Sequence, residues 1–378
     1  MHPDLIVVGA GAVGASLARA ARGLRVTLVS HEPRAVRTPP GEGFDARVYA
    51  LSPGNVAFLQ EIGVALPAER ITPVHAMRVF GDDGASSIEF DAYRAGMPAL
   101  AWIVEDGVLQ DALCQGLEVE VGEVERFEVH EQKILVSLKN RGTLEANLLV
   151  GADGANSTVR RLARIEAKES GYGQSAVVAN FRCAKPHAST AYQWFLGGAV
   201  LALLPLPRGQ VSMVWSLPQA EAARISALPA RDFCKEVEQA SRGVLGALEL
   251  SCAPKSYVLR RLAAQHLVAP RVALVGDAGH VVHPLAGQGL NLGLQDARAL
   301  AHVLAGREPV RDAGELALLR RYERARAEPI LTMAAGIEGL YRLFGAEGAF
   351  AARLRNAGLN LVDRVPVLKN ALARQAMQ

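Results

Sequence analysis

The N-terminal segment combines short apolar runs with a helical pattern. Residues 5–8 are continuously apolar and end at a glycine, which is typical of a buried parallel strand. A helical pattern with apolar positions at Leu17, Ala18 and Ala21 follows, and residues 26–29 form a second apolar run. This order predicts a strand, a helix and a second strand, the unit from which open parallel sheets are built.

A second strand–loop–helix unit lies closer to the C-terminus. Residues 271–275 are a β-branched apolar run, and a loop rich in glycine, proline and histidine follows. From Leu290 to Leu304 the apolar positions recur at spacings of three and four, which predicts a helix. The start of such a helix directs free backbone N–H groups and a positive dipole end into the loop, which suits an anionic group. Asp277 lies at the carboxyl end of the strand, where open α/β sheets place ligand contacts.

Between these two units the pattern predicts mostly β-structure. The expected strands are 77–90 (a hairpin broken at 82–84), 101–105, 124–129, 134–138, 144–150, 172–181, 192–196, 199–204, 210–216 and 257–262. The expected helices are 53–63, 108–113 and 231–248. After Leu304 the chain is predicted to be helical to its end.

Composition and charge restrict the class of protein. The chain has 378 residues, half of them apolar, and a formal charge of +3 that is too small to indicate a nucleic-acid partner. Residues 298–378 hold 13 Lys+Arg and 8 Asp+Glu, so this end carries +5, which fits acidic lipid headgroups, an acidic partner protein or a solvated helical face. The four cysteines show no paired short spacing, so free thiols in a reducing cytoplasm are expected and no metal site is predicted.

The first strand–helix junction carries the sequence GAGAVG at residues 9–14, a GxGxxG pattern in the context that dinucleotide-binding sites require. Glycines there allow a tight turn and a close approach of the backbone to a pyrophosphate. The acid that usually ends the second strand is replaced by Ser30, and the nearest carboxylate is Glu32. Either Glu32 reaches the ribose hydroxyls, or Ser30 and water take that role. The candidate dinucleotide contacts in the loop are Gly9, Gly11, Ala12 and Gly14.

Three further segments resemble one enzyme family, in the order that the family has them. The sequence GDAGHVVHPLAGQGLNLG at 276–293 resembles the GD motif of the class A flavoprotein aromatic hydroxylases, and most of all the ubiquinone-biosynthesis hydroxylases of the UbiH/UbiF/VisC type. FDARVYAL at 44–51 resembles the D-x-R segment of the same family, and GADGANSTVR at 151–160 resembles its DG motif. The likeness covers nearly the whole chain.

The resemblance implies FAD as the cofactor and brings particular residues to it. In the family, the aspartate of the GD motif binds the ribityl chain, the proline-containing loop lines the flavin ring, and the next helix start faces the flavin pyrimidine. Pro284, Leu290 and Asn291 are therefore expected to form the catalytic flavin environment, without an obligatory side-chain base. The other residues that the resemblance brings to FAD are Arg47, Gln110, Asp153, Gly154, Gly276, Asp277, Gly287 and Gly289.

The implied fold is α/β, a Rossmann-like FAD-binding domain of the aromatic-hydroxylase type with an interleaved antiparallel-sheet substrate domain and a helical C-terminus. The expected segments are 1–75, 98–165 and 265–310 for the discontinuous FAD-binding domain, 76–97 and 166–264 for the substrate-binding sheet, and 311–378 for the C-terminal helices.

The implied activity is that of an FAD-dependent monooxygenase that uses O₂ and NAD(P)H. It would hydroxylate the aromatic ring of a prenylated phenol in ubiquinone biosynthesis through a flavin C4a-hydroperoxide, because no side chain activates oxygen by itself. Phe195 and Leu203 in the predicted sheet are the candidate contacts for a lipophilic aromatic substrate. A soluble aromatic substrate and a non-catalytic, flavin-bound assembly subunit stay open as alternatives. His280 and His283 each admit a structural and an acid–base interpretation.

No second complete GxGxxG is present, so NAD(P)H is expected to dock transiently against the FAD-binding domain. The basic C-terminal end is compatible with a peripheral position at the inner face of the membrane and with a complex of quinone enzymes. A homo-oligomer is compatible with the same features.

Overall fold

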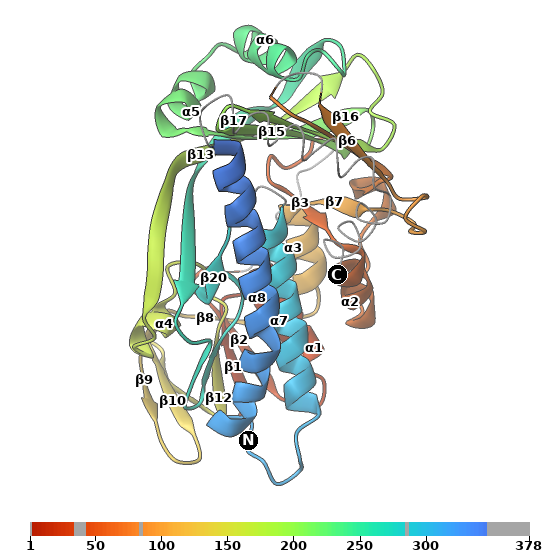
Figure 1. The fold of residues 1–378 in the computed structure, drawn as a ribbon. Coiled ribbons are helices and arrows are strands. Elements are labelled where there is room, and N and C mark those ends of the chain that lie inside the picture. The colour runs from red at the N-terminus through yellow and green to blue at the C-terminus, as the bar shows by residue number, and fades with distance from the viewer. Residues whose placement is uncertain (1, 34–42, 83–85, 284–286, 346–378) are drawn as a thin grey trace.

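The structure of the chain is a computed structural model that describes residues 2–33, 43–82, 86–283 and 287–345, with side chains described as far as residue 339. Figure 1 shows one sheet at the top of the molecule and another in its lower half. Two long helices, α7 (Gln288–Ala305) and α8 (Leu316–Gly345), run lengthwise between these levels (Figure 1). The predicted α/β fold is confirmed.

Within the described residues, the lower sheet has six strands, and all of them run parallel except the edge strand β18. In spatial order they are β18 (Val268–Ala269), β19 (Val272–Leu274), β12 (Leu148–Gly151), β1 (Leu5–Val8), β2 (Val26–Ser30) and β8 (Val119–Val121). Strand β1 is buried throughout, as a parallel strand covered on both faces must be.

Alternate residues of β1 enter two different cores. Leu5 and Val7 pack with the helices α1 (Ala12–Ala20), α3 (Asp106–Cys114), α7 and α8. Ile6 and Val8 pack on the opposite face with α4 (Thr158–Leu162) and a three-stranded meander. The strands of the meander are β9 (Val124–Val129), β10 (Ile134–Leu138) and β11 (Gly142–Ala146).

The predicted strand 144–150 is in fact two strands that separate at Asn147. β11 pairs antiparallel with β10, whereas β12 pairs parallel with β1 and β19. The apolar run continues across the break because both strands bury residues, so the hydrophobic pattern alone did not reveal the change of sheet.

The upper sheet joins eight strands of the described chain, and neighbours run antiparallel except β14 and β5. In spatial order they are β20 (His280–Val281), β17 (Leu248–Ala264), β13 (Ala167–Cys183), β16 (Gln210–Pro218), β15 (Ala199–Leu206), β14 (Thr190–Leu196), β5 (Ala76–Phe80) and β6 (Ser87–Asp91). The segment division expected from the sequence stays a prediction, and β20 joins this sheet although it falls in the 265–310 segment.

The helices over the upper sheet differ from the prediction. Helix α5 (Gln219–Ser226) was not predicted, and α6 (Ala230–Ala240) ends eight residues before the expected position 248. The chain turns at Arg242 and Gly243, whose φ angles of 54° and 61° are left-handed, and β17 begins soon afterwards. Both helices pack on the outer face of the sheet (Figure 1).

A small sheet lies between the two large ones and fixes the D-x-R segment. Its strands are β3 (Val48–Leu51), β7 (Ala101–Glu105) and β4 (Ile71–Val74), and the turn η1 (Ala68–Arg70) directly precedes β4. Helix α2 (Pro53–Glu61), which follows β3, matches the predicted helix. Buried Glu105 accepts hydrogen bonds from Arg70 at 2.7 Å and from the Asp45 amide at 2.6 Å. Asn180 of the upper sheet donates to the Phe44 and Asp45 carbonyls at 3.1 and 2.8 Å, so the upper sheet and the small sheet meet at this segment.

The helix predicted after residue 304 is present as α8, and residues 346–378 lie outside the described part of the chain. Arg326 of α8 is buried and donates to the Asp296 carboxylate of α7 at 2.6 Å. Asp296, which is fully buried, also accepts from the Gly276 amide at 2.9 Å and lies 2.6 Å from His280. One carboxylate thus joins α7, α8 and the loop after β19.

Among the described helices, none is both long and apolar enough to cross a bilayer.

Replacement of Arg326 by leucine is predicted to lower the free energy of unfolding by about 3 kcal/mol, because it removes the guanidinium that compensates the buried Asp296 carboxylate. Urea denaturation followed by circular dichroism measures the loss. Arg324→Leu on the exposed face of the same helix is the matched control and should stay within about 0.5 kcal/mol of the wild type. Equal stability of the two variants would contradict this assignment.

Candidate functional site

The glycine-rich loop between β1 and α1 is packed tightly on one side and open on the other. A Cβ on Gly9, whose φ is +107°, would lie 2.2 Å from the Ala152 carbonyl oxygen, and a Cβ on Gly14 would lie 1.9 Å from the Gly9 carbonyl oxygen. A Cβ on Gly11, in contrast, would meet nothing within 4 Å. Helix α1, which begins at Ala12, has no side-chain cap, so its first N–H groups are available to an anion approaching beside Gly11.

Gln110 lies behind this loop on α3 and is largely buried. Its amide nitrogen donates to the Ala10 carbonyl and approaches the Cys114 sulfur at 3.1 Å. The structure therefore places Gln110 on the backbone of the loop, where it fixes the orientation of the Ala10 peptide.

Ser30 and Glu32, the two candidates for the contact to the ribose hydroxyls, lie together at the end of β2. The Ser30 hydroxyl accepts the Glu32 amide at 3.3 Å, and the exposed Glu32 carboxylate lies 3.5 Å from His31. The segment 34–42, which follows directly, is outside the described residues.

The DG segment is stiffened by its own aspartate and tied to the GD segment. The Asp153 carboxylate accepts from the Thr158 and Val159 amides at 2.7 and 3.1 Å, at the start of α4, and Gly154 has a left-handed φ of 76°. Arg160 is buried and donates to the Ala278 carbonyl at 2.8 Å. The two motifs, more than a hundred residues apart, are thus joined by a direct hydrogen bond.

The GD segment forms a short 3₁₀ turn, η2 (Gly276–Ala278), packed against the start of α1. A Cβ on Gly276 would lie 3.1 Å from Val13, and one on Gly293 of α7 would lie 2.6 Å from it, so both positions need glycine for this close packing. The Asp277 side chain is exposed beside this junction. Partial enclosure by protein raises the pKa of its carboxyl, although His280 and Arg47 offset part of that effect.

Arg47 lies close enough to Asp277 for their charges to interact, and it contacts residues of two sheets. Its guanidinium carbon lies 5.3 Å from the ring centre of Tyr49 and 5.9 Å from that of Tyr257 in β17. The Tyr49 hydroxyl donates to Asp106 at 2.9 Å. Arg47 is exposed and sits next to the open side of the GD turn, a position from which a five-donor cation can bind phosphate.

The start of α7 presents backbone rather than side chains. Gly287 caps the helix in a left-handed conformation, with a φ of 61° and no side-chain cap, and a Cβ on Gly289 would meet nothing within 4 Å. Leu290 is half-buried. The Asn291 side chain is buried and accepts from the Ser52 amide at 3.0 Å, so it anchors α2 to α7. Pro284 lies outside the described residues.

The two histidines of the loop occupy opposite electrostatic environments. Burial acts to lower the pKa of His280, but the Asp296 carboxylate outweighs it and holds that pKa above its usual value. Burial lowers the pKa of His283 to about 4, and its Nε2 lies 3.2 Å from the Gln174 side-chain oxygen. Both rings are buried and lie against another side chain, which fits the structural interpretation of each.

The candidate substrate residues face opposite sides of the upper sheet. Phe195 packs with Val79 and Ile337 in an apolar cluster that also contains the half-buried Val282, two positions before Pro284. Leu203 packs with Phe233 of α6 in the outer core, away from the small sheet. Side chains alternate along a strand, so the neighbours of Leu203 on β15, and not Leu203 itself, face inward.

Some residues that organise the site were missed at the sequence level. Asp296 occupies the apolar face of α7, and a carboxylate on the buried side of a helical pattern is the signal that could have revealed it. Gln174 and Arg326 gave no comparable signal, because their partners are distant in sequence. In the described part of the chain, no group of three or more His, Cys, Asp or Glu residues could hold a metal ion.

Comparisons with known proteins agree with this geometry. A family model described as an FAD binding domain matches residues 3–334. The chain is 32% identical to the 3-demethoxyubiquinol 3-hydroxylase of Escherichia coli K12, covering 99% of this chain and 98% of the relative. It is 29% identical to the human mitochondrial ubiquinone biosynthesis monooxygenase COQ6, over 98% of this chain and 91% of the relative.

Solved structures share the fold. HpxO of Klebsiella pneumoniae, crystallised with FAD and uric acid, superposes with a TM-score of 0.75 at 19% identity, covering 99% of this chain and 96% of the other. The p-nitrophenol 4-monooxygenase PnpA of Pseudomonas putida superposes with a TM-score of 0.77 at 16% identity, covering 100% and 98%. The chain belongs to the FAD-binding-domain family of FAD-dependent monooxygenases, which use NAD(P)H and O₂ on aromatic substrates.

Proposed function

We propose that this chain hydroxylates the aromatic ring of a prenylated phenol in ubiquinone biosynthesis. The observation that carries the proposal is the match to the Escherichia coli 3-demethoxyubiquinol 3-hydroxylase, which is 32% identical and spans 99% of this chain and 98% of the relative. Because the match is end to end, it includes the upper sheet as well as the cofactor-binding segments. Fold alone would not support a substrate, since many functions share one fold.

The residues present fit FAD. The uncapped start of α1 and the open space beside Gly11 suit a pyrophosphate, while the close packing of Gly9 and Gly14 holds the loop in place. When bound, FAD supplies the oxygen-activating chemistry that side chains lack. Asp277 would hold the ribityl chain from the turn η2, and Arg47 would bind the phosphates.

Other residues act on this site through the backbone. The N–H groups at the start of α7, from Gly287 to Leu290, would stabilise negative charge on a bound cofactor ring, because a helix start without a side-chain cap offers free donors and a positive dipole end. Gln110 holds the Ala10 peptide and Asn291 holds α2 against α7, so both position cofactor contacts. Asp153 and Gly154 shape the turn that faces Gly9.

The substrate lies between the upper sheet and the cofactor. The inner cluster around Phe195 includes half-buried apolar side chains from three separate elements, namely Met77, Val200 and Met333. A lipophilic chain gains free energy by leaving water for such a surface, at about 25 cal/mol per Å² of apolar area. The cluster includes Val282, two residues before Pro284, which supports a prenyl tail bound close to the segment expected to line the flavin.

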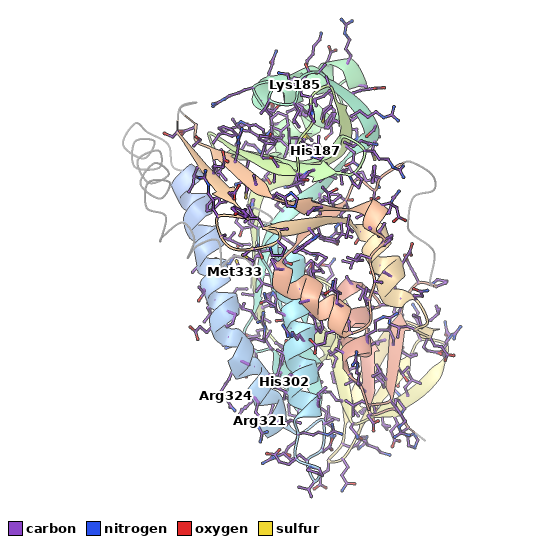
Figure 2. The ribbon with its side chains drawn as sticks, turned by 90° about the vertical axis from the view of Figure 1, so that its right-hand side faces the viewer. Lys185, His187, His302, Arg321, Arg324 and Met333 are labelled. Carbon is purple, nitrogen blue, oxygen red and sulfur yellow. The ribbon has the colours of Figure 1, made fainter. Side chains whose placement is uncertain are left out.

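The basic C-terminal end brings the enzyme to its lipophilic substrate. Arg320 and Arg324 lie exposed on α8, and Figure 2 shows Arg324 near the outer edge of that helix. Contact with the inner face of the membrane, or with a complex of quinone enzymes, follows from this charge and from the apolar substrate. A homo-oligomer is compatible with the same arrangement.

Replacement of Gly14 by alanine is predicted to weaken FAD binding by at least about tenfold, since the new methyl group would lie 1.9 Å from the Gly9 carbonyl oxygen and force the loop apart. Flavin absorbance per polypeptide and fluorescence titration with FAD measure the effect. Gly336→Ala is the control, because that helical position has no heavy atom within 4 Å of an added Cβ. Unchanged FAD affinity in Gly14→Ala would rule out this role for the loop.

The purified flavoprotein is predicted to add one oxygen atom to a phenol bearing a short prenyl chain, with matching consumption of NAD(P)H. We expect kcat/KM for a hydroxybenzoate without the chain to be at least about tenfold lower, because the apolar cluster then contributes no binding energy. Mass spectrometry of the products and NAD(P)H absorbance give both quantities. Hydroxylation of the free hydroxybenzoate alone would replace the proposal with a soluble substrate.

A further inference from the structure

Gln174 connects the upper sheet to the loop that follows the GD turn. It lies on β13 and is largely buried. Its amide nitrogen donates to the Gly198 carbonyl, in the turn between β14 and β15, at 2.7 Å. Its amide oxygen lies 3.2 Å from His283 Nε2. Three segments that are distant in sequence are therefore joined through one side chain.

The direction of each hydrogen bond in this chain is fixed. The Gly198 carbonyl can only accept, so the NH₂ end of Gln174 must face it and the oxygen end must face His283. That oxygen can also only accept, so His283 carries its proton on Nε2. In the neutral ring, Nδ1 is then an acceptor.

The surroundings of His283 favour this neutral form. The ring is fully buried, and Tyr172 of β13 packs edge-on against it with ring centres 4.6 Å apart. The charged groups that face it are Glu338 of α8 and, through a 3.7 Å ion pair with that carboxylate, Arg261 of β17. Burial lowers the pKa of His283 to about 4, and Glu338 offsets only part of the effect.

His283 links this chain of hydrogen bonds to the segment expected to contact the flavin. The residue directly precedes Pro284, in the segment expected to line the flavin ring, and its neighbour Val282 packs in the cluster of Phe195. His280, three residues earlier, is instead held beside the Asp296 carboxylate at 2.6 Å. His280 therefore has a buried carboxylate as its partner, whereas His283 has a neutral amide.

We propose that Gln174 and His283 are positioning residues for the reaction. The Gly198 carbonyl, acting through the Gln174 amide, holds His283 as the neutral Nε2–H tautomer and so fixes the end of the GD segment, up to His283, against the upper sheet. The catalytic part of this proposal rests on the proposed function, whereas the tautomer of His283 does not depend on that function. An imidazole that can neither charge nor flip holds the contact between His283 and β13 in one arrangement and excludes a solvated cation from it.

The tautomer is tested by ¹⁵N NMR of the histidine-labelled holoenzyme, with the His283 signal assigned from its loss in His283→Gln. We expect a neutral Nε2–H ring that does not titrate between about pH 8 and about pH 5.5, well below the ordinary histidine midpoint. Gln174→Glu places a carboxylate beside the His283 ring, so protonation of His283 should then occur within that pH range. Gln210→Glu, also buried in this sheet and hydrogen-bonded to Ser251, is the matched control and should leave His283 neutral. An Nδ1–H tautomer, or wild-type titration near neutral pH, would overturn the proposal.

The catalytic consequence is tested by the ratio of hydroxylated product to NAD(P)H oxidised. His283→Leu removes the donor to Gln174, and this ratio should fall by about tenfold, the equivalent of one lost buried hydrogen bond. His283→Gln keeps an N–H donor at the Nε2 position and should restore most of the ratio. Equal ratios in the two variants would contradict positioning through this bond. A wild type that hydroxylates no prenylphenol would defeat the proposed function instead and leave the NMR result standing.

Discussion

The buried carboxylate of Asp296 is the contact on which the candidate site depends. It accepts the Gly276 amide, lies against His280 and pairs with Arg326, so α7, α8 and the loop after β19 converge on one group. Such a group is stable in the interior because cations and donors surround it, and they hold its pKa below the usual range even though burial acts to raise it. Loss of this arrangement would free the GD turn from α7 and α8 together.

The remaining contacts extend that arrangement outward. Arg160 joins the DG segment to the GD turn, and the close approach of Gly9 to Ala152 joins the DG segment to the first loop. On the other side, Asn291 and Glu105 hold the small sheet and the D-x-R segment. Several of these groups contact backbone atoms, so motifs spread over nearly three hundred residues are held together largely through the main chain.

Local sequence patterns predicted what depends on local physics. The strand–GxGxxG–helix unit, the hairpin near residue 80 and α7 follow from short-range hydrophobic periodicity and glycine placement, and all are present. The sequence did not reveal the break at Asn147, because apolar residues are buried in the strands before and after it. It did not reveal the outward orientation of Leu203 either, because both faces of the upper sheet bury apolar side chains. The Gln174–His283 contact was equally hidden, since its partners are 109 positions apart. The flavin roles of the individual residues stay predictions.

The dissociation constant of FAD for Asp296→Asn tests most directly whether the buried carboxylate organises the cofactor site. The variant keeps the shape of the side chain but removes the charge that fixes His280 and Arg326, and Asp232→Asn in the exposed pair with Lys235 is its control. In protein with native circular dichroism, the account predicts FAD binding weaker by at least about tenfold in Asp296→Asn. A native variant that binds FAD as tightly as the wild type would contradict it.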